Sequence, residues 1–125
     1  MATWIWVALG GALGSLARFW LAAAVGALTG PQFPWGTLLI NVLGSFVIGL
    51  FGALTGTRGP VSVPPDIRIF VMVGICGGFT TFSSFSLQSL ELLQAGEVLW
   101  AGSYIVGSVV LCLLGVWAGA ALGHG

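Results

Sequence analysis

The sequence predicts an all-α membrane protein whose chain crosses the bilayer four times. Of its 125 residues, 58% are hydrophobic and only 5% are charged. A soluble domain carries roughly 25% charged residues, so this chain could not cover a water-facing surface. Its apolar residues fall into four windows, each near the length of about 20 residues that a helical span requires. The linkers between the windows are short, which predicts a single transmembrane domain over residues 1–125 and no soluble domain.

The four windows have recognisable ends. The first covers about residues 3–28 and stops at "TGPQFP", and the second covers about residues 35–54 and stops at "TGTRGPVSVPPD". The third covers about residues 67–93 and the fourth about residues 98–122. Because the N-terminal stretch lacks a basic region and a clear cleavage site, we expect it to be the first span and not a removable signal peptide.

The third window is interrupted by "GGFTTFSSFS", residues 77–86. Glycine tolerates non-helical torsions, so we expect the helix to break at Gly77–Gly78 and to restart near Thr80. A break at membrane depth frees backbone carbonyls and N–H groups, which protein, water or an ion must satisfy. The new helix N-terminus presents partial positive charge, whereas the freed carbonyls suit a small hard cation such as Na⁺.

Polar side chains recur at four-residue spacing along two of the spans. They are Thr37, Asn41 and Ser45 in the second span and Tyr104, Ser108 and Cys112 in the fourth. This spacing places each set on one helix face. Polar groups inside a membrane mark ion pathways or contacts between helices, and for the hydroxyls both readings stay open. Asn41 favours a pathway, because its two N–H donors could serve an anion.

Two phenylalanines follow the interruption. Phe82 and Phe85 lie three residues apart and share a helix face. The edge of an aromatic ring is electropositive, so an anion could meet both rings edge-on beside the Ser and Thr hydroxyls. Ordinary packing of these rings, together with Phe79, is the alternative. Neutral donors can replace hydration water and still release the ion, which favours a passive anion channel over a pump.

The composition excludes several other classes of function. Nucleic-acid binding is implausible without a basic patch, and no nucleotide-binding loop is present. Acidic residues and the lone histidine do not converge into a metal site or an acid–base pair, so we do not expect an enzyme. A structural assembly subunit would explain the 21 glycines, many at the four-residue spacing that lets helices approach closely, but not Asn41 or the interruption. Such close packing suggests that any pathway forms between protomers.

The orientation signal is weak. Arg58 and Arg68 flank the connection between the second and third windows, on the side of the termini. Arg18 lies inside the first window, nearer the other side. The difference in Lys and Arg between the loops on the two sides sets membrane orientation. Here that difference is two basic residues against one, which is too small to fix one orientation, so we expect the chain to insert both ways.

Three motifs together resemble a known family. They are "GGALGSLARF" in the first span, "WGTLLINVLGSFVIG" in the second and "GGFTTFSSFS" in the third. They resemble GGxxGAxxRY, GTLxxNxxGxFxxG and GGxTTFSTFS of the small fluoride channels, the Fluc or CrcB family. The fourth span matches more loosely, through Tyr104 and Ser108.

The resemblance implies an antiparallel homodimer of four-helix subunits, inserted with dual topology in the plasma or inner membrane of the cell. Such proteins conduct fluoride passively, strongly reject chloride and export fluoride through two pores between the subunits. The implied fluoride pore residues are Asn41, Phe82, Phe85, Thr37, Tyr104, Ser108, Thr81 and Ser84. Gly77 and Thr80 would hold a structural Na⁺ at the dimer dyad through backbone carbonyls. Arg18 would attract anions in the vestibule.

Several positions depart from the family pattern. Ser15 replaces the usual alanine, Phe19 the usual tyrosine, and Ser84 a common threonine whose hydroxyl it keeps. Gln88 stands where glutamate is frequent, and Cys112 stands where the polar track can carry another serine, which leaves the extent of that track open.

One rival reading remains, a small dual-topology multidrug or cation transporter. That chemistry needs a carboxylate in the first span, where this chain has Arg18 and no acid.

Overall fold

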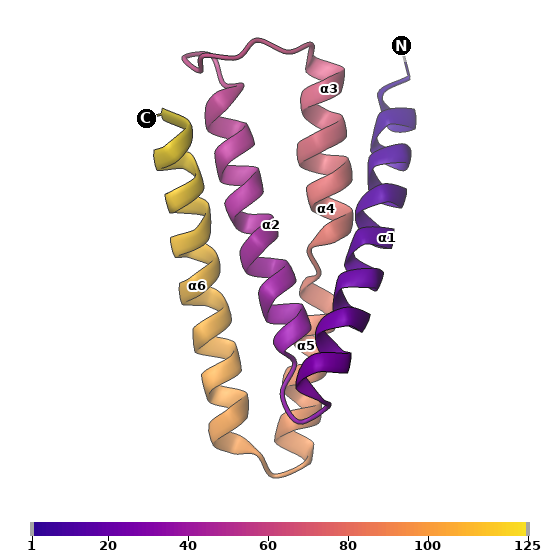
Figure 1. Cartoon of the computed structure of the whole chain (residues 1–125), viewed down its shortest axis with the longest axis vertical. Coiled ribbons are helices and arrows are strands. Elements are labelled where there is room, and N and C mark those ends of the chain that lie inside the picture. Colours follow the sequence, from indigo (N-terminus) through magenta and orange to yellow (C-terminus); the bar gives the residue numbers. More distant parts are fainter. Residues whose placement is uncertain (1, 125) are drawn as a thin grey trace.

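The computed structural model describes residues 2–124, and its elements are helical. The first two spans are α1 (Thr3–Thr29) and α2 (Trp35–Leu54). The third consists of α3 (Pro65–Ile69), the π-helical η1 (Phe70–Ile75), α4 (Cys76–Phe79) and α5 (Phe82–Gln94). The last span is α6 (Val98–His124). Figure 1 shows these elements as one elongated bundle.

Among the described residues, four helical segments are long and apolar enough to cross a membrane, which confirms the predicted fold class. The third segment begins at Pro65, two residues before the predicted start, because proline is favoured in the first helical turn. The free ends of α1 and α6 lie at the same end of the bundle as the α2–α3 connection (Figure 1). The α1–α2 and α5–α6 connections lie at the opposite end. An even number of spans therefore returns the chain to its starting side.

The helices pack through glycines, as their spacing predicts. At the α2–α6 contact, a Cβ added to Gly49 would collide with the Val116 carbonyl, and one added to Gly119 would collide with the Phe46 carbonyl. At the α1–η1 contact, a Cβ on Gly10 would lie 2.8 Å from the Gly74 Cα. Only glycine allows backbones to approach this closely, and in lipid such contact stabilises helix pairs.

The position of the helix break was predicted wrongly. Gly77 and Gly78 are helical residues of α4, and the extended residues are Thr80 (ψ 156°) and Thr81 (φ −148°, ψ 111°). The second half of the span begins at Phe82 with Thr81 as its N-cap, which agrees with the predicted restart near Thr80. Gly78 has a packing role instead, since a Cβ there would lie 2.6 Å from the Gly11 carbonyl oxygen of α1.

The π-helical stretch η1 was not predicted from the sequence. It packs against α1, where the Trp6 and Phe70 rings meet edge to face at 5.7 Å and 79°. A π-helix widens the turn, and such stretches are frequent near functional sites. Here the wider turn carries the chain from α3 into the segment that ends at the break.

Candidate functional site

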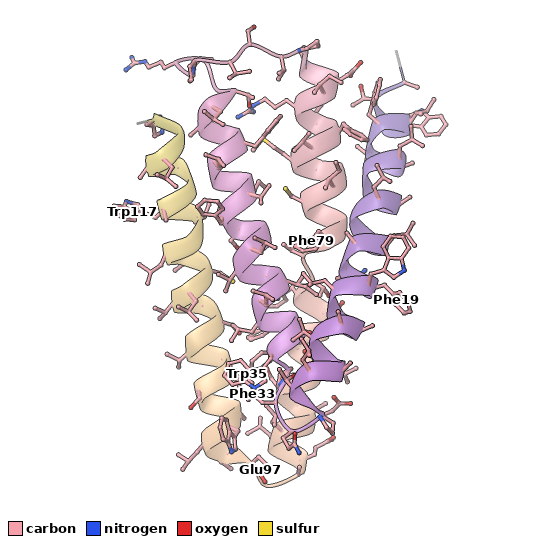
Figure 2. All side chains as sticks on the ribbon, viewed as in Figure 1. Phe19, Phe33, Trp35, Phe79, Glu97 and Trp117 are labelled. Atoms are coloured by element: carbon pink, nitrogen blue, oxygen red, sulfur yellow. The ribbon has the colours of Figure 1, made fainter. Side chains whose placement is uncertain are left out.

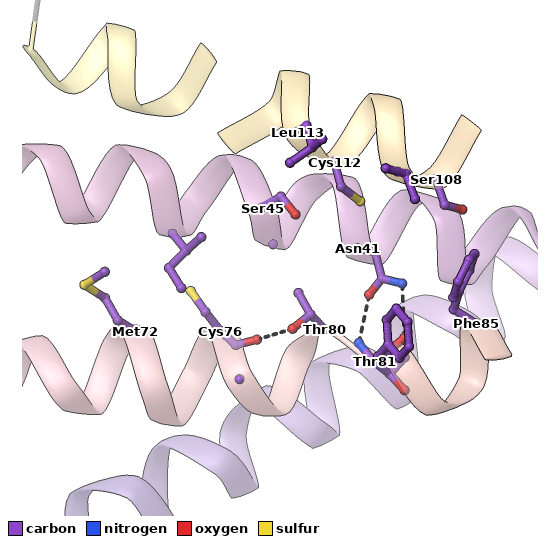
Figure 3. Close-up of a pocket in the computed structure, with 15 residues that line it drawn as sticks. Asn41, Ser45, Met72, Cys76, Thr80, Thr81, Phe85, Ser108, Cys112 and Leu113 are labelled. Atoms are coloured by element: carbon purple, nitrogen blue, oxygen red, sulfur yellow. Dashed lines mark hydrogen bonds between the residues drawn. The ribbon is translucent and has the colours of Figure 1, made fainter. Parts of the chain in front are cut away.

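Asn41 of α2 secures the break in the third span. Its Oδ1 accepts a hydrogen bond from the Thr81 backbone N–H at 2.8 Å, and its Nδ2 donates to the Thr81 carbonyl at 3.2 Å. One side chain thus satisfies both backbone groups of an extended residue at membrane depth, where water is not available to do so. Figure 3 shows this amide facing the break from the neighbouring helix. The Nδ2 group has a second N–H, which this pair of bonds does not use.

The two threonines of the break form hydrogen bonds with the ends of the helices on either side of it. Thr80 donates from its hydroxyl to the Cys76 carbonyl at 2.9 Å, within the last turn of α4. Thr81 is the N-cap of α5, and its Oγ1 accepts a bond from the Ser84 backbone N–H at 3.1 Å. Capping by threonine satisfies an orphan donor and fixes where the helix begins. The predicted pore residues Thr81 and Ser84 are therefore joined in one cap.

Of the backbone carbonyls of Gly77, Gly78 and Thr80 at the break, only that of Gly78 accepts a hydrogen bond among the described residues. Arg18 of α1, half-buried, donates from Nε to the Gly78 carbonyl at 3.0 Å. Within residues 2–124, no hydrogen bond reaches the carbonyl of Gly77 or of Thr80. Gly77 also faces open space, because a Cβ there would meet no atom within 4 Å. Arg18 is thus held against the break, and two nearby carbonyls remain available as ligands.

A cavity of about 370 Å³ lies beside the break, among α2, the third span and α6 (Figure 3). Its lining includes the predicted residues Asn41, Gly77, Thr80, Thr81, Phe82, Phe85 and Ser108. Ser45, Cys112 and Met72 also line it, and no side chain of its described lining is charged. The Ser108 hydroxyl is buried and has no hydrogen-bond partner among the described residues. The cavity therefore offers uncharged donors and aromatic rings.

The two predicted pore rings lie together at the edge of this cavity. Phe82 and Phe85 have ring centroids 5.3 Å apart and an interplanar angle of 46°. Phe82 is 78% exposed in the single chain, whereas Phe85 is half-buried. Phe79 lies apart from this pair and packs against α2, where a Cβ on Gly44 would come within 3.2 Å of its ring.

The predicted residues Thr37 and Tyr104 are buried inside the bundle and do not line this cavity. Tyr104 is fully buried, and its hydroxyl donates to the Gln88 Oε1 at 2.9 Å. Thr37 and Gln88 line a second cavity of about 420 Å³ near the α1–α2 connection. Gln88 is the site residue whose role sequence reasoning left open. Its position one helical turn after Phe85 is the signal that could have placed it on the same face.

The chain is similar to known proteins along most of its length. The family described as "CrcB-like protein, Camphor Resistance (CrcB)" matches residues 5–120. A protein of Rhodospirillum rubrum named "Fluoride-specific ion channel FluC" is 58% identical over 117 residues, 94% of this chain and 91% of that protein. A relative of the same name from Methylocella silvestris is 58% identical over 116 residues, covering 93% of this chain and 88% of that protein.

A third relative, from Paramagnetospirillum magneticum, carries the same name and is 57% identical over 119 residues, 95% of this chain and 93% of that protein. The resemblance drawn from the three motifs is therefore confirmed along nearly the whole chain. This multi-pass membrane protein belongs to the CrcB family.

Proposed function

We propose that this protein is a passive, fluoride-selective ion channel of the plasma or inner membrane that exports fluoride from the cell. The observation that carries the proposal is the uncharged cavity at the helix break, which combines an amide, hydroxyls and a phenylalanine pair. Relatives more than half identical to this chain carry the name of fluoride-specific channels. The activity proposed is conduction and not catalysis.

The lining suits a small anion that must shed its water. The unpartnered Ser108 hydroxyl and the second N–H of Asn41 are donors of the kind that can replace hydration. The ring edges of Phe82 and Phe85 add positive electrostatic character without a fixed charge. Because no lining residue binds the anion as a permanent cation would, the ion can leave as readily as it enters.

A second copy of the chain would complete this site. The α5 surface beside the cavity exposes Phe82, at 78%, together with Ser83 and Ser86, whose hydroxyls bond to Thr81 and to the Phe82 carbonyl within the same chain. In the single chain this proposed pore ring is therefore left uncovered. We propose that an antiparallel partner covers it, so that two pores run between the subunits. The weak Lys/Arg bias of the loops supports insertion in both orientations, because a strong bias would fix one.

Reporter fusions at the C-terminus test this dual topology. We expect the reporter on both faces of the membrane. Adding two or three lysines to one loop should lock one orientation and abolish activity when that form is expressed alone. Co-expression of oppositely locked forms should restore it, and a single orientation of the unmodified chain would contradict the antiparallel dimer.

The carbonyls of Gly77 and Thr80 fit a structural Na⁺. Both lie next to the break, neither has a hydrogen-bond partner in the described part of the chain, and Gly77 faces open space. Oxygen ligands are those that a hard cation prefers. We propose that the two copies present these carbonyls to one ion at their dyad. When bound, the cation would add positive potential beside an anion path that has little fixed charge.

Fluoride efflux from proteoliposomes, with chloride as the comparison ion, tests the proposed function directly. We expect rapid fluoride loss and little chloride loss. Equal leakage of both ions, or none, would contradict it. The multidrug transporter considered above is not supported, because α1 carries no acidic residue and the relatives compared are named as fluoride channels.

A further inference from the structure

Phe33 is a loop residue that packs as if it belonged to the core. It lies in the connection between α1 and α2, residues 30–34, yet only 8% of its surface is exposed. Figure 2 places its ring beside Trp35 at that end of the bundle. Connections between helices run over the surface as a rule, so a buried aromatic side chain in one needs a specific reason.

Contacts between rings lead from Phe33 to the cavity at the break. The Phe33 ring meets Tyr104 edge to face, at 5.4 Å and 84°. Tyr104 then contacts Phe85 at 5.2 Å, and Phe85 contacts Phe82 at 5.3 Å. The chain of rings thus joins a loop near the membrane surface to the two phenylalanines of the proposed fluoride path.

Tyr104 occupies the space between the two cavities. It lines neither, but Phe85 lines the first cavity, and Phe33 and Gln88 line the second. Its hydroxyl is held by Gln88 at 2.9 Å, which fixes one point of the ring. A hydrogen bond at the hydroxyl does not set the tilt of the ring, which depends on the side chains packed around it. Phe33, Leu92 and Ala101 share a buried cluster with Tyr104, and of these three neighbours Phe33 is the one that meets the ring edge to face.

We propose that Phe33 is a positioning residue for fluoride conduction: it sets the tilt of Tyr104, and through Tyr104 it sets the angle at which Phe85 faces the cavity. This inference rests on the proposed channel function. An aliphatic residue at position 33 would fill much of the same volume but would lose the edge-to-face contact. Tyr104 and Phe85 would then sample several angles, and fluoride would meet a less ordered path.

The sequence offers a direct probe, because Tyr104 is the single tyrosine of the chain. Labelling with 3-fluorotyrosine places one ¹⁹F NMR reporter in the chain, on the ring of Tyr104. We expect Phe33→Leu to shift or broaden this resonance and to slow fluoride efflux about tenfold, the scale of one lost aromatic pair. Trp35→Leu is the matched control: Trp35 also contacts Phe33, at 4.6 Å, but is 45% exposed. It should leave both the resonance and the efflux close to wild type.

Size exclusion shows whether each variant still assembles, and Phe33→Met replaces Phe33→Leu if the latter does not fold. An unchanged resonance in the folded variant would overturn the contact between Phe33 and Tyr104. A changed resonance with unchanged efflux would overturn its role in conduction. Failure of the proposed function itself would appear separately, as wild-type protein that conducts no fluoride.

Discussion

The α2–α6 contact and the break in the third span are two regions at membrane depth where the backbone is stabilised in different ways. Where Gly49 and Gly119 meet the facing helix, every backbone group keeps its own helical partner, and the glycines only permit approach. At Thr80–Thr81 the backbone leaves the helix, and Asn41 and Arg18 satisfy its groups from neighbouring spans. The first arrangement needs shape alone and the second needs polar partners, so the two regions should respond differently to substitution.

Gly119→Ala should have the largest effect, because it damages the fold itself. The added Cβ would collide with the Phe46 carbonyl and lie 2.8 Å from the Leu50 N, so α2 and α6 must separate. We expect a loss of stability of at least about 1–3 kcal/mol, seen as a low yield of assembled protein on size exclusion and a lower Tm. Gly102→Ala is the control, since a Cβ there meets nothing within 4 Å. It should be neutral or stabilise by up to about 1 kcal/mol, and equal behaviour of both variants would contradict close α2–α6 packing.

Asn41→Asp should separate conduction from folding. The carboxylate can still accept from the Thr81 N–H, so the break keeps one of its two supports. It loses the donor to the Thr81 carbonyl and places negative charge beside the proposed fluoride path. Fluoride efflux should fall to background while the proposed dimer stays intact on size exclusion. Near-normal efflux would remove Asn41 from the pathway.

The same contrast shows what sequence reasoning can and cannot reach. Four spans, their ends and the glycine contacts follow from local pattern, because hydropathy and small-residue spacing are local properties. The break was assigned to Gly77–Gly78 because only the flexibility of glycine was considered. Its real position, Thr80–Thr81, depends on an amide 40 residues away in the sequence. The burial of Phe33 was not predicted for the same reason, since its partner Tyr104 lies in another span.

Phe82→Ile and Phe85→Ile should each lower fluoride efflux sharply without loss of assembly. Isoleucine retains apolar bulk but has no electropositive ring edge. Phe85→Ile also removes a ring contact with Tyr104 at 5.2 Å, so its effect should be the larger of the two. Efflux from proteoliposomes at matched protein amounts measures both. If both variants conducted as wild type, the rings would be packing residues and no part of the path.

Removal of Na⁺ should reduce fluoride efflux less completely than Asn41→Asp. The protein and liposomes would be prepared in sodium-free buffer with N-methylglucamine, a cation too large for ligation by the Gly77 and Thr80 carbonyls. If these carbonyls bind Na⁺, its loss leaves them unsatisfied and removes positive potential beside the path. Adding back Na⁺ should restore efflux, with Li⁺ a partial substitute. Undiminished efflux after exhaustive removal would mean that the break serves only to aim Phe82 and Phe85.

Phe79→Leu should have the smallest effect, because Phe79 is near the break in sequence but belongs to the packed region in structure. Its ring lies against Gly44 of α2 and does not line the cavity. Leucine is smaller than phenylalanine but keeps an apolar contact, and Phe79 is only half-buried, so the change should cost about 1 kcal/mol. Efflux should stay close to wild type and Tm should fall slightly, the reverse of the Phe82 and Phe85 variants. A strong loss of efflux at unchanged Tm would extend the conduction path to the α4 side of the break and would show that Phe79 is a pathway residue and not a packing residue.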